Sequence, residues 1–269
     1  KFLLFDLFWK GILEMKFIIS ATTDIGLTKS TNQDSYNVRV FSTKQGKVVF
    51  AVLCDGMGGL AKGEVASATL VNAYCKWADN KLPVLCENGI KDTDISADWI
   101  GIATEYNEKI KSYAASYGIN MGTTATVLML TEKRYYIMNV GDTRAYEIAD
   151  NVTVLTKDQT VVAREIECGN LTVEEAEKDS RRSILLQCIG ASEAVYPDMF
   201  FGETKLDATY MLCSDGFRHE ITEEEIYKYL NPGVMTDENS MKRNMDALID
   251  LNKQRQERDN ISVVTIRTF

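Results

Sequence analysis

The sequence of 269 residues predicts an α+β fold, a four-layer α-β-β-α sandwich of two antiparallel sheets flanked by helix pairs. Short runs rich in β-branched and aromatic residues form two blocks, one in the first quarter of the chain and one from residue 123 onward. Two long stretches with helical spacing separate the blocks. This order lacks the strict strand and helix alternation of a doubly wound parallel sheet.

The first block predicts three strands and the following region predicts two helices. The strands are expected over 17–23, 35–41 and 47–54. A helix is expected from about residue 62, because Val65, Leu70, Ala73 and Trp77 recur at spacings that place them on one helix face. A second helix is expected over 95–117, after a polar loop.

The second block predicts more strands and a closing helix. Strands are expected over 123–131, 134–140, 144–149, 151–155, 184–189, 199–205 and 208–213. A polar, helix-prone stretch covers 158–182. The last long helix is expected over about 237–257, with Met241, Met245, Leu248 and Ile249 on one face, and residues 261–269 close the chain as a strand.

Composition predicts an ordinary soluble chain with one domain. Hydrophobic residues make up 45% of it, charged residues 26%, and there are only 3 prolines. No linker rich in Pro, Gly or Ser divides residues 15–269, so we expect a single domain there. Residues 1–14 form an N-terminal extension of unknown role. They are apolar but carry Asp6, Lys10 and Glu14, and they are too short for a membrane span.

Charge and the rarer residues exclude several function classes. A formal net charge of −9 disfavours a nucleic-acid partner. The six cysteines contain no CxxC pair, which indicates reduced thiols in a cytoplasmic protein. The single histidine, His219, excludes metal centres with several histidines and is expected to be structural or merely exposed. A catalytic metal must then lie among oxygen ligands, which favours magnesium, manganese or calcium.

Carboxylates follow or precede several of the predicted strands. Two apolar strands run into Asp55-Gly56 and Asp215-Gly216, a third delivers Asp142, and Asp259 precedes the final strand. An isolated Asp-Gly pair is typical of a hairpin turn. Four carboxylates at the ends of buried strands, however, would repel one another unless a cation lay between them. If they converge, a metal site is the simplest explanation.

Eight short motifs follow one another along the chain between Thr23 and Ile266. They are NQD (32–34), DGMGG (55–59), GTTA (122–125), VGDTR (140–144), LTKDQ (155–159), CIG (188–190), SDG (214–216) and DN (259–260). Each motif alone is weak evidence. In this order they closely resemble the metal-dependent protein phosphatases of the type 2C family, and most of all their bacterial branch.

The resemblance implies a metal centre at one end of the sandwich. Asp55 would bridge two ions, Asp215 and Asp259 would complete the first, and the Gly56 carbonyl would contribute to the second. The ions would be Mn²⁺ or Mg²⁺, and a third ion would bind to Asp142 together with Asp215. Glycines after Asp55 allow the backbone and a phosphate to approach closely.

The resemblance also implies the reaction. A hydroxide between the ions would attack phosphorus in line, and phosphoserine or phosphothreonine would be hydrolysed without a covalent intermediate. Asp34 would orient a metal-bound water, so that the catalytic set is Asp34, Asp55, Asp215 and Asp259. The partners would be phosphorylated proteins, the substrates of a serine/threonine kinase. A monomer without a membrane span is expected.

Two positions depart from the family pattern. Lys29 stands where relatives have an arginine that binds phosphate, so its charge is kept but the two-pronged donor geometry is lost. Met57 stands where eukaryotic relatives have a histidine proposed to protonate the leaving oxygen. The segment 157–197 corresponds to the flap beside the active site of bacterial relatives. Its Arg181 and Arg182 could steer a phosphoprotein, but a solvated charged face is the default interpretation.

Two other functions compete with a metal-dependent phosphatase as explanations of the sequence. A cysteine phosphatase needs five residues between its nucleophile and an arginine, but only four separate Cys213 from Arg218, and no glycine-rich phosphate cradle is present. A catalytically weak or silent phosphatase-like module would bind phosphoproteins or a signalling partner. Loss of metal-binding aspartates would mark such a module, and they are all present.

Overall fold

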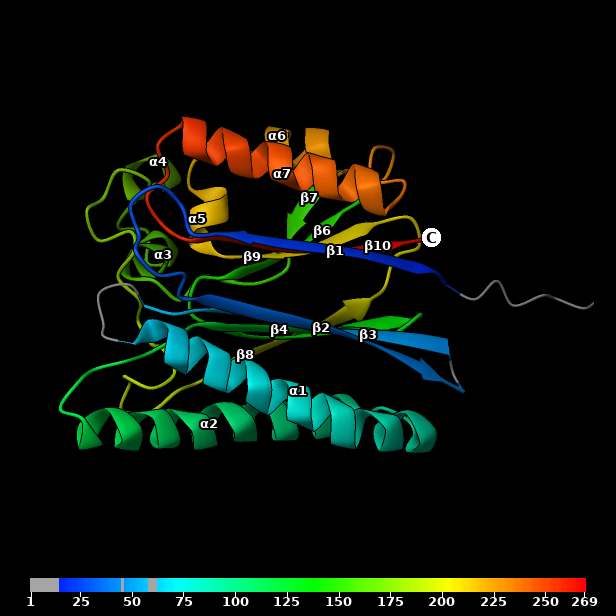
Figure 1. Ribbon diagram of the computed structural model, residues 1–269, viewed down its shortest axis with the longest axis horizontal. Helices are drawn as coiled ribbons and strands as arrows, with labels where there is room; N and C mark the ends of the chain where they lie inside the picture. Colours follow the sequence, from blue (N-terminus) through cyan, green and yellow to red (C-terminus); the bar gives the residue numbers. More distant parts are fainter. Residues whose placement is uncertain (1–14, 45, 58–61) are drawn as a thin grey trace, which may run out of the picture.

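Two antiparallel sheets lie face to face at the centre of the molecule, and helices cover both outer faces (Figure 1). The structure is a computed structural model that describes residues 15–44, 46–57 and 62–269. The N-terminal extension 1–14 and the glycines of 58–59 lie outside the described residues. The predicted four-layer α-β-β-α sandwich is confirmed.

The first sheet joins strands from both ends of the chain. Its order is β1-β10-β9-β6-β7, and all its neighbours are antiparallel. The strands are β1 (Phe17–Asp24), β10 (Ile261–Thr268), β9 (Thr209–Cys213), β6 (Arg144–Ile148) and β7 (Val152–Val154).

The second sheet has the order β2-β3-β4-β5-β8, again antiparallel throughout. Its strands are β2 (Asp34–Thr43), β3 (Gly46–Asp55), β4 (Ala125–Leu130), β5 (Arg134–Val140) and β8 (Asp198–Glu203). Because β3 is an interior strand that is buried on both faces, its sequence is an uninterrupted apolar run instead of an alternating one.

The helices form the outer layers. Helices α1 (Gly63–Asn88) and α2 (Asp92–Ser116) cover the second sheet, while α6 (Glu223–Leu230) and α7 (Glu238–Gln254) cover the first (Figure 1). Three short helices, α3 (Val161–Glu167), α4 (Val173–Ala176) and α5 (Asp215–Arg218), lie at one end of the sandwich. None of the described helices is long and apolar enough to cross a membrane.

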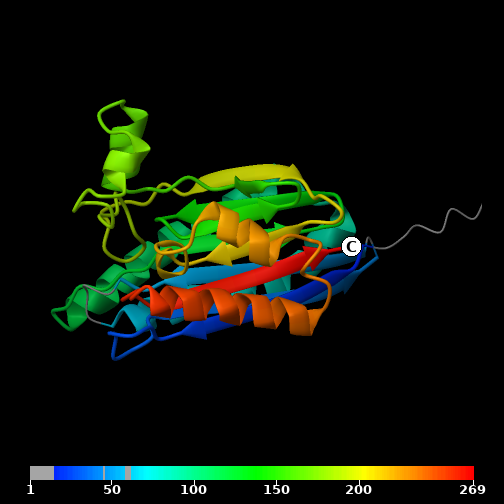
Figure 2. The same ribbon diagram turned by 90° about the horizontal axis from the view of Figure 1, so that it is seen from above.

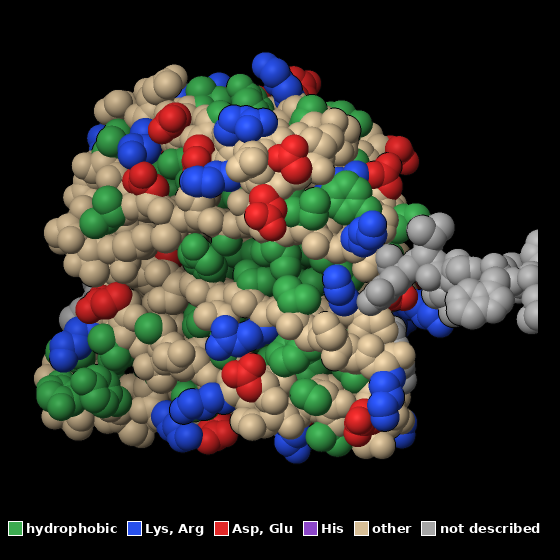
Figure 3. All heavy atoms as spheres, turned by 45° about the vertical axis from the view of Figure 1, so that its right-hand side comes forward, with side chains coloured by type: hydrophobic (Ala, Val, Ile, Leu, Met, Phe, Trp, Pro, Cys, Tyr) green, Lys and Arg blue, Asp and Glu red, His purple; other side chains and the backbone are tan. Residues whose placement is uncertain are grey.

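Three apolar cores hold the layers together. Residues such as Val49, Leu53 and Leu212 fill the space between the sheets, and none of these three is exposed to solvent. Figure 3 shows hydrophobic side chains in a band between the helix layers on one face, and charged side chains above and below it. All six cysteines are free in the structure, and five of them are buried.

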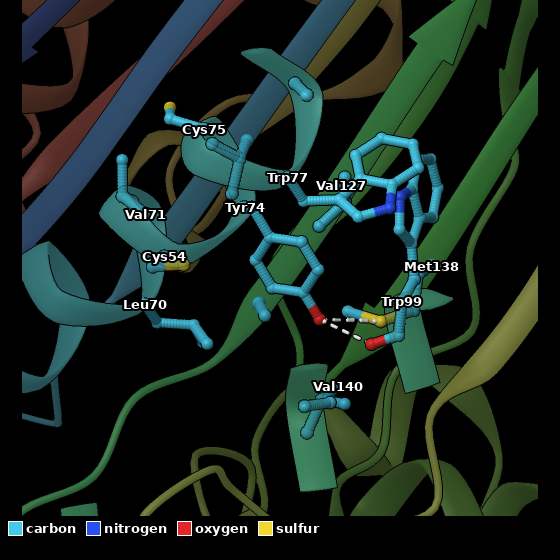
Figure 4. Close-up of a cluster of buried hydrophobic side chains, with 14 of the residues drawn as sticks. Cys54, Leu70, Val71, Tyr74, Cys75, Trp77, Trp99, Val127, Met138 and Val140 are labelled. Carbon is cyan, nitrogen blue, oxygen red and sulfur yellow. Dashed lines mark hydrogen bonds between the residues drawn. The ribbon is translucent and has the colours of Figure 1, made fainter. Parts of the chain in front are cut away.

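The core under α1 and α2 is rich in aromatic residues (Figure 4). Trp99 is fully buried and packs edge-on against Trp77, with ring centroids 5.4 Å apart. Tyr74 donates its hydroxyl hydrogen to the Trp99 carbonyl at 3.0 Å, with the Met138 sulfur at 3.1 Å. These contacts fix both helices on the sheet that carries β3.

Two details of the predicted elements are wrong. The segment 184–189 is not a strand, because Leu185 and Ile189 form isolated bridges with two separate segments, at Thr160 and Thr123. Helix α6 was not predicted, although Thr222 and Glu225 form the capping box that marks its beginning. The helix-prone stretch 158–182 is divided into α3 and α4.

Residues of the 157–197 segment extend away from the sandwich. Figure 2 shows the region of α4 standing out from the body of the molecule, at the end where α3 also lies. Arg181 and Arg182 are exposed, and Arg181 is paired with Asp179 at 2.7 Å. This exposure agrees with a solvated charged face, and a role in steering a phosphoprotein stays a prediction.

Replacing Trp99 tests the importance of the aromatic core. Trp99→Ala should lower the free energy of unfolding by about 3–5 kcal/mol, because a large cavity opens between α1, α2 and the sheet. Val84→Ala on α1 is the control, since Val84 is 53% exposed and such surface changes typically stay within about 0.5 kcal/mol. Urea unfolding measures both, and equal effects would contradict the assignment.

Candidate metal centre

The pairing of β2 with β3 brings two carboxylates together. Asp34 is the first residue of β2 and Asp55 is the last residue of β3, and the register places them directly opposite each other. Facing residues of an antiparallel pair have Cβ atoms only about 4.5–5.5 Å apart, and like charges there are destabilising. The sheet therefore holds a close pair of acids at this end.

The pairing of β9 with β10 delivers two more acids to the same end. Asp215 follows β9 as the first residue of α5, and Asp259 precedes β10. Across the two chains, the Ser214 N–H donates to the Ser262 carbonyl at 3.0 Å. A Cβ on Gly216 would lie 2.3 Å from the Asn260 carbonyl oxygen, so only glycine allows this approach.

Asp142 lies in the crossing between the two sheets. Gly141 adopts a positive φ of 100° at the turn from β5 to β6, and its N–H donates to the Gln159 side chain at 2.8 Å. Arg218 donates to the Asp142 carbonyl at 2.9 Å and lies 3.6 Å from its carboxylate. The same guanidinium contacts Asp158 at 3.2 Å.

Backbone hydrogen bonds fix Asp55 without engaging its carboxylate. The Asp55 N–H donates to the Thr124 hydroxyl at 2.9 Å, and its carbonyl accepts from the Thr124 N–H and the Thr123 hydroxyl, both at 2.9 Å. Gly56 donates to the Gln33 carbonyl at 3.1 Å, and a Cβ there would lie 2.4 Å from the Gly63 carbonyl. This packing explains why glycine follows Asp55.

Asn260 joins the loop before β2 to the site. Its side-chain oxygen accepts from the Gln33 N–H at 2.9 Å, while its amide donates to the Ile25 and Thr31 carbonyls at 2.9 and 3.2 Å. These bonds hold the loop that carries Lys29 against the beginning of β10. Asn260 is thus a scaffold of the site, a role the sequence alone did not reveal.

Burial and repulsion by neighbouring carboxylates raise the pKa values of three of these acids, Asp34, Asp55 and Asp142. Burial, and then the charges of Asp34, Asp215, Asp142 and Asp259, raise the pKa of Asp55 well above its usual value. Burial and the Asp215 charge raise the pKa of Asp34 to about 6. Burial and the same Asp215 charge raise the pKa of Asp142 to about 7, although Arg218 opposes the shift. The five carboxylates therefore converge electrostatically.

Several carboxylate oxygens at this end have no hydrogen-bond donor. Both oxygens of Asp34 and Oδ1 of Asp215 are buried without a partner. The Ser214 and Ser262 hydroxyls lower the pKa of Asp34 somewhat, but neither makes a hydrogen bond of ordinary geometry with it. Buried anionic oxygens without donors are typical ligands of hard cations such as Mg²⁺ or Mn²⁺. The residues present therefore fit a divalent ion.

Besides Arg218, the basic side chains of Lys29 and His219 lie among the acids. Lys29 Nζ is 2.7 Å from Asp259 Oδ1, and its side chain is 27% exposed. Burial alone would lower the pKa of Lys29, but the Asp259 hydrogen bond and the Asp55 and Asp215 charges raise it. His219 lies 3.4 Å from Asp215. In the described part of the chain, no group of three or more His, Cys, Asp or Glu side chains is already arranged closely enough to hold a metal ion.

The Asp-Gly pairs are not hairpin turns. Asp55-Gly56 leads out of β3 toward α1, and Asp215-Gly216 opens α5. His219 is not merely exposed, because its side chain lies between Asp215 and Glu257. Its Nδ1 is 3.3 Å from Glu257 Oε2. Burial would lower the pKa of His219, but the Glu257 hydrogen bond and the Asp215 charge raise it. The sequence does hold a signal for this contact: His219 lies four residues after Asp215, a spacing that places two side chains on the same side of a helical turn.

Known proteins share this sequence and architecture. The model of the protein phosphatase 2C family matches residues 27–250. A putative protein phosphatase 2C-type of Streptococcus pyogenes is 31% identical over 253 residues, covering 92% of this chain and 96% of that protein. The serine/threonine phosphatase stp of Listeria monocytogenes is 28% identical over 248 residues, covering 91% of this chain and 93% of that protein.

Solved structures agree. The serine/threonine phosphatase of S. agalactiae superimposes with a TM-score of 0.80 at 28% identity, covering 94% of this chain and 99% of that one. The catalytic domain of the phosphatase PstP in complex with 2 manganese ions gives a TM-score of 0.74 at 26% identity, with coverage of 94% and 99%. Similarity of this extent, in both sequence and fold, shows that the chain belongs to the protein phosphatase 2C family.

Proposed function

We propose that this chain is a metal-dependent protein serine/threonine phosphatase whose active centre lies where β2, β3, β9 and β10 end. The observation that carries the location is the set of buried, unpartnered oxygens of Asp34 and Asp215 beside Asp55. Relatives that match most of the chain are named serine/threonine phosphatases. We assign phosphorylated proteins as the substrates of this chain.

The metal ligands are assigned from these strand ends. Asp55, Asp215 and Asp259 with the Gly56 carbonyl would hold two ions, Mn²⁺ or Mg²⁺, and Asp142 with Asp215 would add a third. When bound, such ions supply an acidified water nucleophile and neutralise charge on the phosphate. The protein provides positions: the hydrogen bonds between Asp55 and Thr124 and the short crossing between the sheets fix where the carboxylates stand.

Asp34 and Lys29 act on the water and the phosphate. Both carboxylate oxygens of Asp34 are buried without a hydrogen-bond partner directly opposite Asp55, so they are placed to accept hydrogen bonds from a water at the centre. Asp34 is therefore suited to orient the attacking water. Lys29 holds Asp259 at 2.7 Å in this structure. Once cations neutralise Asp259, the ammonium is free to bind a phosphate oxygen.

We assign residues 15–269 to a single catalytic domain and 157–197 to its flap. We expect a monomer that reverses the action of a serine/threonine kinase. A cytoplasmic location is supported by the free, mostly buried cysteines. The alternative of a silent phosphoprotein-binding module is not favoured, because every acid of the centre is retained.

Replacing Asp215 tests the active centre. Asp215→Asn should lower kcat/KM for phosphothreonine peptides by more than about a hundredfold, because even groups behind metal ligands are typically worth about 10- to 100-fold. EDTA should abolish turnover and Mn²⁺ should restore it. Asp246→Asn is the matched control, since Asp246 is paired with Lys242 on the exposed face of α7. Metal-independent turnover would contradict the proposal.

Replacing Lys29 separates phosphate binding from catalysis. Lys29→Met should raise KM about ten- to a hundredfold with little change in kcat, the usual worth of a hydrogen bond to a charged group. It should also tighten Mn²⁺ binding, because a competing cation leaves Asp259. Lys242→Met on α7 is the control. An unchanged KM would show that Lys29 only pairs with Asp259 and does not bind the phosphate.

The raised pKa values predict how pH affects the metal-free protein. A carboxyl whose pKa is higher in the folded state binds its proton more tightly there, so stability falls as pH rises from the unfolded value to the folded one. For Asp34 and Asp142 this window runs from about 4 to about 7. In EDTA, the melting temperature should therefore fall across this window.

Saturating Mg²⁺ should remove or reverse this fall, because the ion replaces the protons that relieve repulsion. Asp34→Asn should reduce the slope in EDTA, since one raised carboxyl is lost. Differential scanning fluorimetry over the pH range measures all three cases. A metal-free melting temperature that rises with pH across the window would contradict the electrostatic convergence of the acids.

A further inference from the structure

The only histidine of the chain bridges two carboxylates behind the proposed metal centre. His219 Nε2 lies 3.4 Å from Asp215 Oδ2, and Nδ1 lies 3.3 Å from Glu257 Oε2. The side chain of His219 is 16% exposed and that of Glu257 is 7% exposed. The three groups therefore form a chain of contacts shielded from most solvent.

Glu257 also fixes the turn that presents Asp259. Its second oxygen, Oε1, accepts hydrogen bonds from the backbone N–H of Arg258 at 2.6 Å and of Asp259 at 2.8 Å. The Glu257 N–H donates to the Asn252 carbonyl at 3.0 Å, which ties the turn to the end of α7. One carboxylate thus joins His219 to the backbone of a second proposed metal ligand.

The two oxygens of Asp215 have different surroundings. Oδ2 faces the imidazole of His219, while Oδ1 is buried without any hydrogen-bond partner. Asp215 begins α5 and His219 directly follows its last residue, and the His219 N–H donates to the Asp215 carbonyl at 3.0 Å. The imidazole therefore limits rotation of the carboxylate and leaves one oxygen available to a ligand.

We propose that His219, held by Glu257, is a positioning residue that aligns Asp215 and Asp259 for cation binding. This inference rests on the proposed function and assigns a role to two residues outside the ligand set. Outer groups of this kind orient metal ligands and are typically worth about 10- to 100-fold in metal affinity or activity. Without His219, Asp215 and Glu257 would also face each other without a donor between them.

Metal affinity provides the first test. Isothermal titration calorimetry with Mn²⁺ compares the full chain with His219→Ala, His219→Gln and Glu257→Ala. We expect dissociation constants about 10- to 100-fold weaker for the two alanine variants. His219→Gln should recover much of the loss, because its amide can donate to Asp215. In turnover assays with phosphothreonine peptides, kcat at fixed Mn²⁺ should fall while KM for the peptide changes little.

The matched control is Tyr210→Phe. Tyr210 donates to the buried Glu147 at 2.9 Å from the other end of β9, so its removal also deprives a buried carboxylate of a donor. This variant should lower the melting temperature and leave Mn²⁺ affinity unchanged. If His219→Ala likewise lowers only the melting temperature, with Mn²⁺ affinity within twofold of the unaltered chain, the positioning role is overturned.

A spectroscopic readout follows from the single histidine. The ring C–H signals of His219 are unique in a ¹H–¹³C NMR spectrum, because no other histidine is present. Mg²⁺ should shift these signals in the unaltered chain, and Asp215→Asn should abolish the shift. A ring that ignores Mg²⁺ would overturn the inference. A chain that binds metal but hydrolyses no phosphopeptide would overturn the proposed function instead, while the affinity comparison still decides the role of His219.

Discussion

Repulsion among converging carboxylates is the constraint on which this structure depends. Strand pairing alone sets Asp34 opposite Asp55, and the crossing from β5 to β6 brings Asp142 to the same end. No rearrangement of one side chain can disperse these charges, because the backbone positions are fixed by ladders of hydrogen bonds. The fold has to offset the repulsion with protons, with Lys29 and Arg218, or with bound cations.

The layers of the fold were readable from sequence because burial follows simple periods. Strand β3 has an unbroken apolar run and lies in the interior of its sheet, and α7 has a single apolar face and covers a sheet. The segment 184–189 also looked like a strand, since its Ile-Leu-Leu run is apolar. Its backbone instead bonds two separate segments, and nothing local in a sequence shows which partner a strand will find.

Of the site, the sequence predicts mainly the candidate metal ligands. Aspartates after apolar strands predict carboxylates at strand ends, but their partners come from distant parts of the chain. Asn260 reaches the loop at Ile25, and Lys29 reaches Asp259 across 230 positions of sequence. No motif in the sequence assigns a catalytic role to His219. Its contact with Glu257 depends on how α5 packs beside the turn before β10, which periodicity does not encode.

The proposed centre draws on both sheets, and this links the packing of the core to the chemistry. Asp34 and Asp55 belong to the sheet under α1 and α2, while Asp215 follows and Asp259 precedes strands of the sheet under α7. Ligand distances tolerate errors of only a few tenths of an ångström. The dry layer between the sheets, with Leu53 and Leu212 fully buried, must therefore hold their relative position to that accuracy. A close-packed core resists sliding because any shift opens voids, so the apolar layer acts as the scaffold that makes a centre of opposed charges possible.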